Sequence, residues 1–97
     1  MSPPDAAGAL TRVMNIVNEK GLHARASAKF VQLVEKYDAK VQVSRAGETV
    51  GGDSIMGLMM LAAGIGTSIS VTASGAQAAE VMAALHDLVS NKFGEEE

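Results

Sequence analysis

Apolar and polar residues alternate along short stretches of the chain, as they do in strands that bury one face. The alternation is clearest in residues 40–45 (KVQVSR) and 67–74 (TSISVTAS), where valine, isoleucine and alanine share one side. Residues 10–18 (LTRVMNIVN) alternate less regularly but are rich in β-branched side chains. Residues 48–52 follow an Ala-Gly turn at 46–47. The pattern therefore predicts four strands, with the middle two joined as a hairpin.

Two longer segments change to the spacing of amphipathic helices. Residues 24–37 form the first one, directly after a glycine-containing turn at 19–21. The last helix is expected to begin at an S-x-x-Q capping box formed by Ser74 and Gln77. The stripes that would face the core comprise Ser27, Phe30, Val31, Val34 and Tyr37 in the first helix, and Val81, Met82, Leu85, Leu88 and Val89 in the last.

A shorter helix is predicted over residues 55–62 (IMGLMMLA), after two residues that can each cap its start, Asp53 and Ser54. Gly57 would allow a neighbouring segment to approach this helix closely. Its methionines are interpreted as core residues, with an adaptable docking surface as the alternative: Met56, Met59 and Met60.

The predicted order is β-α-β-β-α-β-α, without an internal repeat or linker. Strands with one apolar face need one covering layer, which amphipathic helices supply. We therefore expect an α+β fold of two layers, with a mostly antiparallel sheet that is open to water on its other side. Residues 9–93 would form this single domain, residues 1–8 a flexible tail, and residues 94–97 a solvated acidic tail.

Composition narrows the classes of function. The chain has 97 residues, a net charge of −3 and no cysteine. Disulfides and thiolate zinc sites are thus excluded, and no basic surface favours nucleic acid. The amino end lacks the features of a signal peptide, and the longest apolar stretch, residues 55–66, is about half of the ~20 residues that span a membrane. We expect a monomeric cytoplasmic protein without membrane insertion.

His23 is the main candidate for chemistry, because it lies between the turn and the start of the first helix. It could be an ordinary capping or surface histidine. A metal site is poorly supported, since His86 is the only other histidine and lies far along the chain. A serine hydrolase is also poorly supported, since no G-x-S-x-G motif is present. The local chemistry suits a phosphoryl acceptor better than either.

The surroundings of His23 in the sequence suit a phosphoryl group. Near neutral pH much of an imidazole population is neutral and nucleophilic. The helix start offers free backbone N–H groups and the positive end of a dipole. Arg25 adds a guanidinium that can hold phosphate oxygens, and Gly21 leaves the ring unshielded.

Two motifs resemble those of the HPr family, the histidine phosphocarriers of the phosphoenolpyruvate:sugar phosphotransferase system. GLHARASAKF is similar to the family's active-site segment, and DSIMGLMML to its regulatory serine helix. The resemblance extends over residues 9–93. It implies an open-faced sandwich in which three helices cover one face of a four-stranded antiparallel sheet. It also implies a carrier, not an enzyme, that needs no cofactor or metal.

The resemblance implies a role for three residues. His23 would be phosphorylated on Nδ1, Arg25 would stabilise the phosphoryl group, and Ser54 would be a regulatory phosphorylation site. One position departs from the family's pattern, since Ala26 stands where proline usually follows the arginine. Alanine restores an N–H group and makes the turn less rigid, which leaves the rate of transfer open.

The implied partners are enzyme I as donor, IIA-type proteins as acceptors, and an HPr kinase/phosphatase acting on Ser54. Ser54 has a second interpretation as a helix cap without regulatory role. The alternative function is a regulatory binding module controlled at Ser54, in catabolite regulation or in a nitrogen-type phosphotransferase system. The sequence does not distinguish the sugar or the pathway served.

Overall fold

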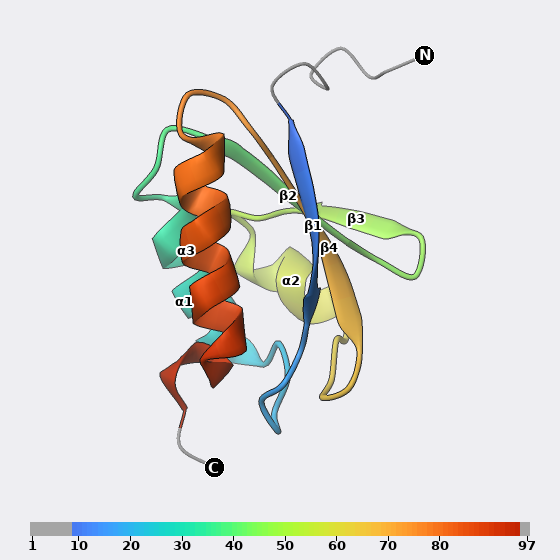
Figure 1. Cartoon of the computed structure of the whole chain (residues 1–97). Helices are drawn as coiled ribbons and strands as arrows, with labels where there is room; N and C mark the ends of the chain where they lie inside the picture. The colour runs from blue at the N-terminus through green and yellow to red at the C-terminus, as the bar shows by residue number, and fades with distance from the viewer. Residues whose placement is uncertain (1–8, 96–97) are drawn as a thin grey trace.

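The computed structural model describes residues 9–95, so the predicted tail at 1–8 and the last two residues lie outside the described part. The predicted element order β-α-β-β-α-β-α is confirmed and is followed by a short 3-10 helix (Figure 1). The strands are β1 (Leu10–Asn15), β2 (Lys40–Arg45), β3 (Glu48–Gly51) and β4 (Ser68–Ser74). The helices are α1 (Ala24–Val34), α2 (Ile55–Met60), α3 (Ala78–Ser90) and the 3-10 helix η1 (Lys92–Gly94).

The strands form one antiparallel sheet in the order β1-β4-β2-β3. Strand β4 lies in the middle, pairing Val71 with Arg12 of β1 on one side and with Val43 of β2 on the other. Figure 1 shows α1 and α3 packed along one side of this sheet. The predicted α+β fold, a four-stranded antiparallel sheet covered on one face by helices, is confirmed.

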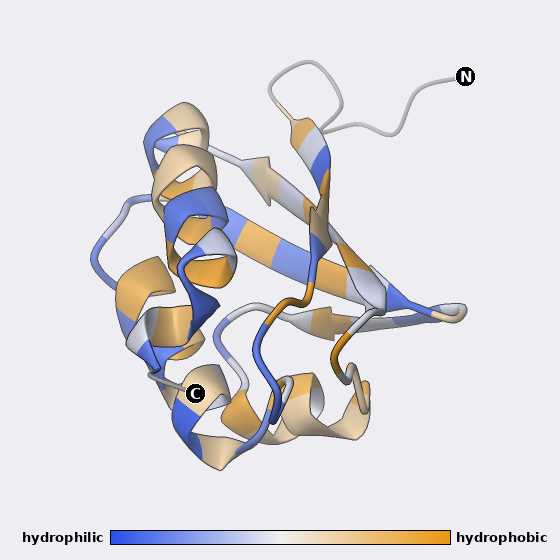
Figure 2. Cartoon of the chain, turned by 60° about the horizontal axis from the view of Figure 1, so that its bottom comes forward, coloured by the Kyte–Doolittle hydropathy of each residue, from blue (hydrophilic) through white to orange (hydrophobic). Residues whose placement is uncertain are grey.

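The alternation along the strands separates core from solvent as predicted. In β4 the side chains of Ile69, Val71 and Ala73 are buried, whereas those between them are not. Figure 2 shows the same alternation of hydrophobic and hydrophilic residues along the strands. The helical stripes meet this buried face through side chains such as Phe30 of α1 and Leu85 of α3, both fully buried.

The predicted start of the last helix is wrong. Ser74 is the final residue of β4, where it pairs with Lys40, and so it cannot cap a helix. Helix α3 instead follows Gln77, whose side chain makes no capping bond. The side-chain oxygen of Gln77 accepts a hydrogen bond from the backbone N–H of Asp38 at 2.7 Å. The backbone N–H of Gln77 donates to the Asp38 carbonyl at 2.9 Å. A partner distant in sequence therefore replaces the local capping box.

The interpretation of the methionines as core residues is also wrong. Met56, Met59 and Met60 are 72%, 41% and 68% exposed, and in α2 only Leu58 is buried. A helix of six residues turns a single narrow face to the core. The other faces leave an apolar surface in water, as the alternative interpretation requires.

Candidate functional site

The turn before α1 is tied to the loop that follows α2. Gly21 has a φ of 60°, and a side chain there would lie 2.2 Å from the carbonyl oxygen of Ala63. The next residue, Leu22, donates its N–H to that carbonyl at 2.9 Å. Glycine is therefore required both for the backbone conformation and for the close approach. Gly21, predicted to leave the ring unshielded, thus also allows this contact between the two loops.

His23 is the N-cap residue of α1, with extended backbone angles of φ −73° and ψ −179°. Its carbonyl accepts the N–H of Ser27 at 2.9 Å, which closes the first helical turn. Its side chain makes no capping bond. The N–H groups of the first turn, from Ala24 to Ala26, thus have no acceptor within the helix. This helix end carries partial positive charge, and the first turn of α1 itself holds no acidic side chain.

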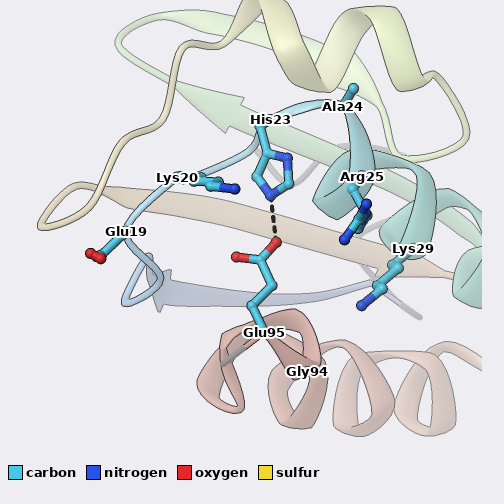
Figure 3. A pocket seen from close by; sticks show the side chains of 8 residues that line it. All are labelled: Glu19, Lys20, His23, Ala24, Arg25, Lys29, Gly94 and Glu95. Carbon is cyan, nitrogen blue, oxygen red and sulfur yellow. Dashed lines mark hydrogen bonds and ion pairs between the residues drawn. The ribbon is translucent and has the colours of Figure 1, made fainter. Parts of the chain in front are cut away.

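The imidazole of His23 is held from the side away from α1. Its Nε2 atom is hydrogen-bonded to the Glu95 carboxylate, as Figure 3 shows. The side chain of His23 is 27% exposed, and that of Glu95 is 13% exposed. Among the described residues no hydrogen bond involves Nδ1 of His23, which lies on the side of the ring facing the start of α1 (Figure 3).

Glu95, which the sequence predicted to belong to a solvated tail, lies at this site and contacts His23. Its other carboxylate oxygen accepts a hydrogen bond from Nδ2 of Asn18 at 3.1 Å. Asn18 is completely buried and also donates to the Gly21 carbonyl at 2.9 Å. Asn18 therefore joins the turn before α1 to the carboxyl end of the chain. No sequence motif signals this contact between residues so far apart.

The chain reaches His23 because it turns sharply after α3. Lys92 and Phe93 adopt left-handed φ angles of 57° and 56°, and Gly94 follows with 75°. Phe93 is fully buried, and Nζ of Lys29 donates to its carbonyl at 2.6 Å. A left-handed backbone conformation is costly for a residue with a side chain. The buried ring of Phe93 anchors this turn in the core and so stabilises it. The next side chain, that of Glu95, points at the imidazole.

Opposing effects set the charge state of Glu95. Burial raises the pKa of its carboxyl group, but hydrogen bonds from His23 and Asn18 and the charges of His23 and Lys20 lower it. The net result is a pKa below the ordinary value for glutamic acid. Glu95 is therefore an ionised carboxylate at neutral pH.

A hollow of about 660 Å³ lies beside His23 (Figure 3). Lys20, Arg25 and Lys29 supply three cationic side chains to its lining. Arg25 is exposed, and its guanidinium forms no ion pair with any residue in the part of the chain that the structure describes. The structure thus brings together His23 and Arg25, the two residues that the sequence predicted to act at one site.

Ser54 lies outside this hollow, at the start of α2. Its Oγ accepts a hydrogen bond from the Gly57 N–H at 2.9 Å, so Ser54 caps this helix, as its place in the sequence allowed. A side chain on Gly57 would come within 3.0 Å of Val50 Cβ, which explains the glycine. Met59 of α2 contributes to a small hollow that His23 also lines. The apolar surface of α2 therefore reaches the edge of the histidine site.

The structure offers no other centre of comparable chemistry within residues 9–95. No group of three or more potential ligands in this part of the chain is placed to hold a metal ion. His86 lies half-buried on α3 and lines a hollow together with residues of β1. None of the helices in the described range is both long and apolar enough to cross a membrane.

Comparison with known proteins agrees with the fold and shows the family. The family model described as PTS HPr component phosphorylation site matches residues 10–91. The phosphocarrier protein HPr of Cupriavidus necator is 49% identical over 88 residues, which cover 91% of this chain and 99% of that protein. HPr of Neisseria meningitidis is also 49% identical over the same shares of each chain. The crystal structure of HPr-C-His from Thermoanaerobacter tengcongensis superposes with a TM-score of 0.86 at 38% identity, covering 91% of this chain and 99% of that one.

Fold, site and relatives together define a phosphocarrier protein, a class whose members carry a phosphoryl group and are not themselves catalysts. The chain belongs to the HPr family of the phosphotransferase system.

Proposed function

We propose that His23 accepts a phosphoryl group on Nδ1 from phospho-enzyme I and passes it to IIA-type proteins. The observation that carries the proposal is the orientation of the ring. Glu95 holds Nε2, whereas Nδ1 has no hydrogen-bond partner among the described residues and faces the uncapped start of α1. An unshared electron pair is thereby presented where a phosphoryl group would meet positive charge.

The first turn of α1 and Arg25 would stabilise the transferred group. Free N–H groups at a helix start bind phosphate oxygens, and the helix dipole favours negative charge there. Arg25 is exposed and shares the hollow with His23, so its guanidinium can form charge-assisted hydrogen bonds to the same oxygens. At Ala26 an N–H replaces the nitrogen of the family's usual proline, which adds a donor at this position.

The donor and acceptor proteins would dock beside His23 on the apolar surface of α2. Ile55, Met56, Met59 and Met60 are all exposed there. Methionine adapts to differently shaped partners, which a carrier needs because it must bind a donor and an acceptor in turn. The protein would act as a monomer in each of these encounters.

Labelling from phosphoenolpyruvate tests this function. The protein is incubated with its cognate enzyme I and radioactive phosphoenolpyruvate, then purified and mixed with a IIA protein. We expect an acid-labile phosphate that moves on to IIA. His23→Ala should take up no label, whereas His86→Ala, which removes the chain's other histidine, should behave as wild type. Labelling of His23→Ala at the wild-type level would contradict the proposal.

We further propose that a kinase phosphorylates Ser54 and thereby weakens docking of enzyme I. Ser54 is only partly buried and lies next to the exposed Ile55 and Met56. A phosphate there would add about −1.5 to −2 charges at the rim of an apolar contact surface. Burying that charge against a partner is costly unless the partner supplies a cation. Phosphorylation by a purified HPr kinase, compared in wild type and Ser54→Ala, tests the site.

A further inference from the structure

The Glu95 carboxylate determines where His23 carries its proton. One oxygen contacts Nε2 of His23, and the other accepts from Nδ2 of Asn18. An ionised carboxylate only accepts hydrogen bonds, so Nε2 must be the protonated nitrogen of the ring. In the neutral imidazole the other nitrogen, Nδ1, then has no proton and keeps its electron pair free.

Asn18 fixes the orientation of the carboxylate. Both amide protons are used, one toward the Gly21 carbonyl and one toward Glu95. The buried Oδ1 atom has no partner among the described residues. Exchanging the oxygen and nitrogen of this amide would place Oδ1 against two other acceptors, so only the present orientation satisfies the network. Because Asn18 is wholly buried, it has no room to turn away.

The backbone that carries Glu95 is also held. The N–H of Glu95 donates to the Lys92 carbonyl at 3.0 Å, and that of Gly94 to the Asn91 carbonyl at 2.9 Å. The buried ring of Phe93 anchors the turn. Glu95 therefore reaches His23 from an anchored turn.

We propose that Glu95 is a positioning residue that directs phosphorylation to Nδ1 of His23. The inference rests on the proposed phosphoryl transfer and adds what selects the accepting atom. In the step, the electron pair of Nδ1 forms a bond to phosphorus. The bond between phosphorus and the donor atom breaks, and its electron pair stays with the donor. The proton remains on Nε2, so the ring becomes cationic, and the adjacent carboxylate stabilises that charge. Without Glu95, Nε2 would compete for the phosphoryl group.

A small phosphoryl donor separates this inference from docking. Phosphoramidate phosphorylates histidine without any protein partner, and phosphorus NMR distinguishes the two phosphohistidine isomers. At early times wild type should form the Nδ1 isomer almost alone. In Glu95→Ala the share of the Nε2 isomer should rise severalfold. Glu80→Ala, which removes an exposed carboxylate from the opposite end of α3, is the matched control and should match wild type.

A third variant separates geometry from charge. Glu95→Gln keeps a similar shape and an acceptor oxygen but loses the charge, so it should restore part of the preference for Nδ1. Equal isomer ratios in wild type, Glu95→Ala and Glu80→Ala would overturn the inference. If instead enzyme I fails to label His23 in wild type, the proposed function is wrong, while the phosphoramidate ratios still decide the role of Glu95.

The proton position in the unphosphorylated protein is a second readout, which needs no phosphoryl donor. Ring nitrogen chemical shifts at about pH 9, where imidazole is neutral, report which nitrogen carries the proton. We expect the proton of His23 on Nε2 in wild type and a mixture of both forms in Glu95→Ala. A wild-type ring protonated mainly on Nδ1 would overturn the inference, whatever the variants do.

Discussion

The first two helices begin in similar backbone conformations and yet differ in how their first turns are satisfied. His23 and Ser54 are both N-cap residues with extended backbone angles. The hydroxyl oxygen of Ser54 accepts the N–H of Gly57 and so fills one free donor of α2. The His23 ring makes no such bond, because Glu95 holds it from the other side.

The difference shows how a helix start is kept available for a ligand. A capping side chain stabilises the helix but occupies the donors that an anion would use. At α1 the side chain is instead the group that we propose to be modified, and it contacts a carboxylate outside the helix. Stability supplied by a cap at α2 is thus given up at α1, where we propose that phosphoryl transfer takes place.

The largest expected effect comes from replacing His23 by serine, which would make the start of α1 resemble the start of α2. His23→Ser should abolish labelling from phosphoenolpyruvate, because no imidazole remains. It should nevertheless be more stable than His23→Ala by about 1 kcal/mol, since serine can cap α1. Urea unfolding of the two variants measures this difference. Equal stabilities would mean that the backbone at residue 23 does not permit a side-chain cap.

Arg25→Ala should keep His23 as the phosphoryl acceptor but remove a cation that stabilises the transferred group. Loss of a charged hydrogen bond of ~1.5–3 kcal/mol would slow transfer from enzyme I roughly tenfold to a hundredfold. Arg12→Ala removes another exposed arginine, on β1, and serves as the control. Rapid-quench measurement of the transfer rate tests both. Equal rates for wild type and Arg25→Ala would remove Arg25 from the mechanism.

Substitutions at Ser54 should separate capping from charge. Ser54→Ala loses the cap and should unfold more easily by about 1 kcal/mol, with transfer from enzyme I unchanged. Ser54→Asp keeps a good cap, so stability should be preserved while transfer slows severalfold, because a charge is added beside the apolar surface. Comparing transfer rates with unfolding curves tests the two roles. If both variants transfer at the wild-type rate, and phosphorylated protein does too, Ser54 is a helix cap only.

The smallest expected effect is the loss, at acid pH, of the contribution that Glu95 makes to the free energy of unfolding. Its pKa is lower in the folded protein than the ordinary value of 4.5. Its contribution to stability is therefore fully present above that ordinary value, and is lost as the pH falls through the folded value. The unfolding free energies of wild type and Glu95→Gln should differ near neutrality and converge in acid. A difference that does not change down to about pH 2 would contradict an ionised Glu95 carboxylate hydrogen-bonded to His23.

The sequence predicted the elements well where local patterns determine them. Alternation in β4 and the stripes of α1 and α3 follow from which side chains avoid water, and such patterns are visible without tertiary structure. The start of α3 was placed wrongly because Gln77 pairs with the Asp38 backbone, a partner in a different part of the chain. The methionines of α2 were misassigned because hydrophobicity alone does not distinguish a core from a contact surface.

The residues of the site also differ in whether local sequence could predict them. His23 and Arg25 lie two residues apart at one helix start, so their proximity could be predicted from the sequence. Glu95 could not, since its contact with His23 depends on the left-handed turn at Lys92 and Phe93 and on the buried Asn18. The resemblance to known phosphocarriers also gave no role to the carboxyl end.

The central claim is that His23 carries the phosphoryl group on Nδ1 at the uncapped start of α1. Phosphorus–nitrogen correlation NMR on ¹⁵N-labelled protein, phosphorylated by enzyme I and phosphoenolpyruvate, tests it most directly. We predict one phosphorus resonance, coupled to Nδ1 of His23, with the proton retained on Nε2. A phosphorus resonance coupled to His86, to Nε2 of His23, or to no imidazole nitrogen would contradict the claim.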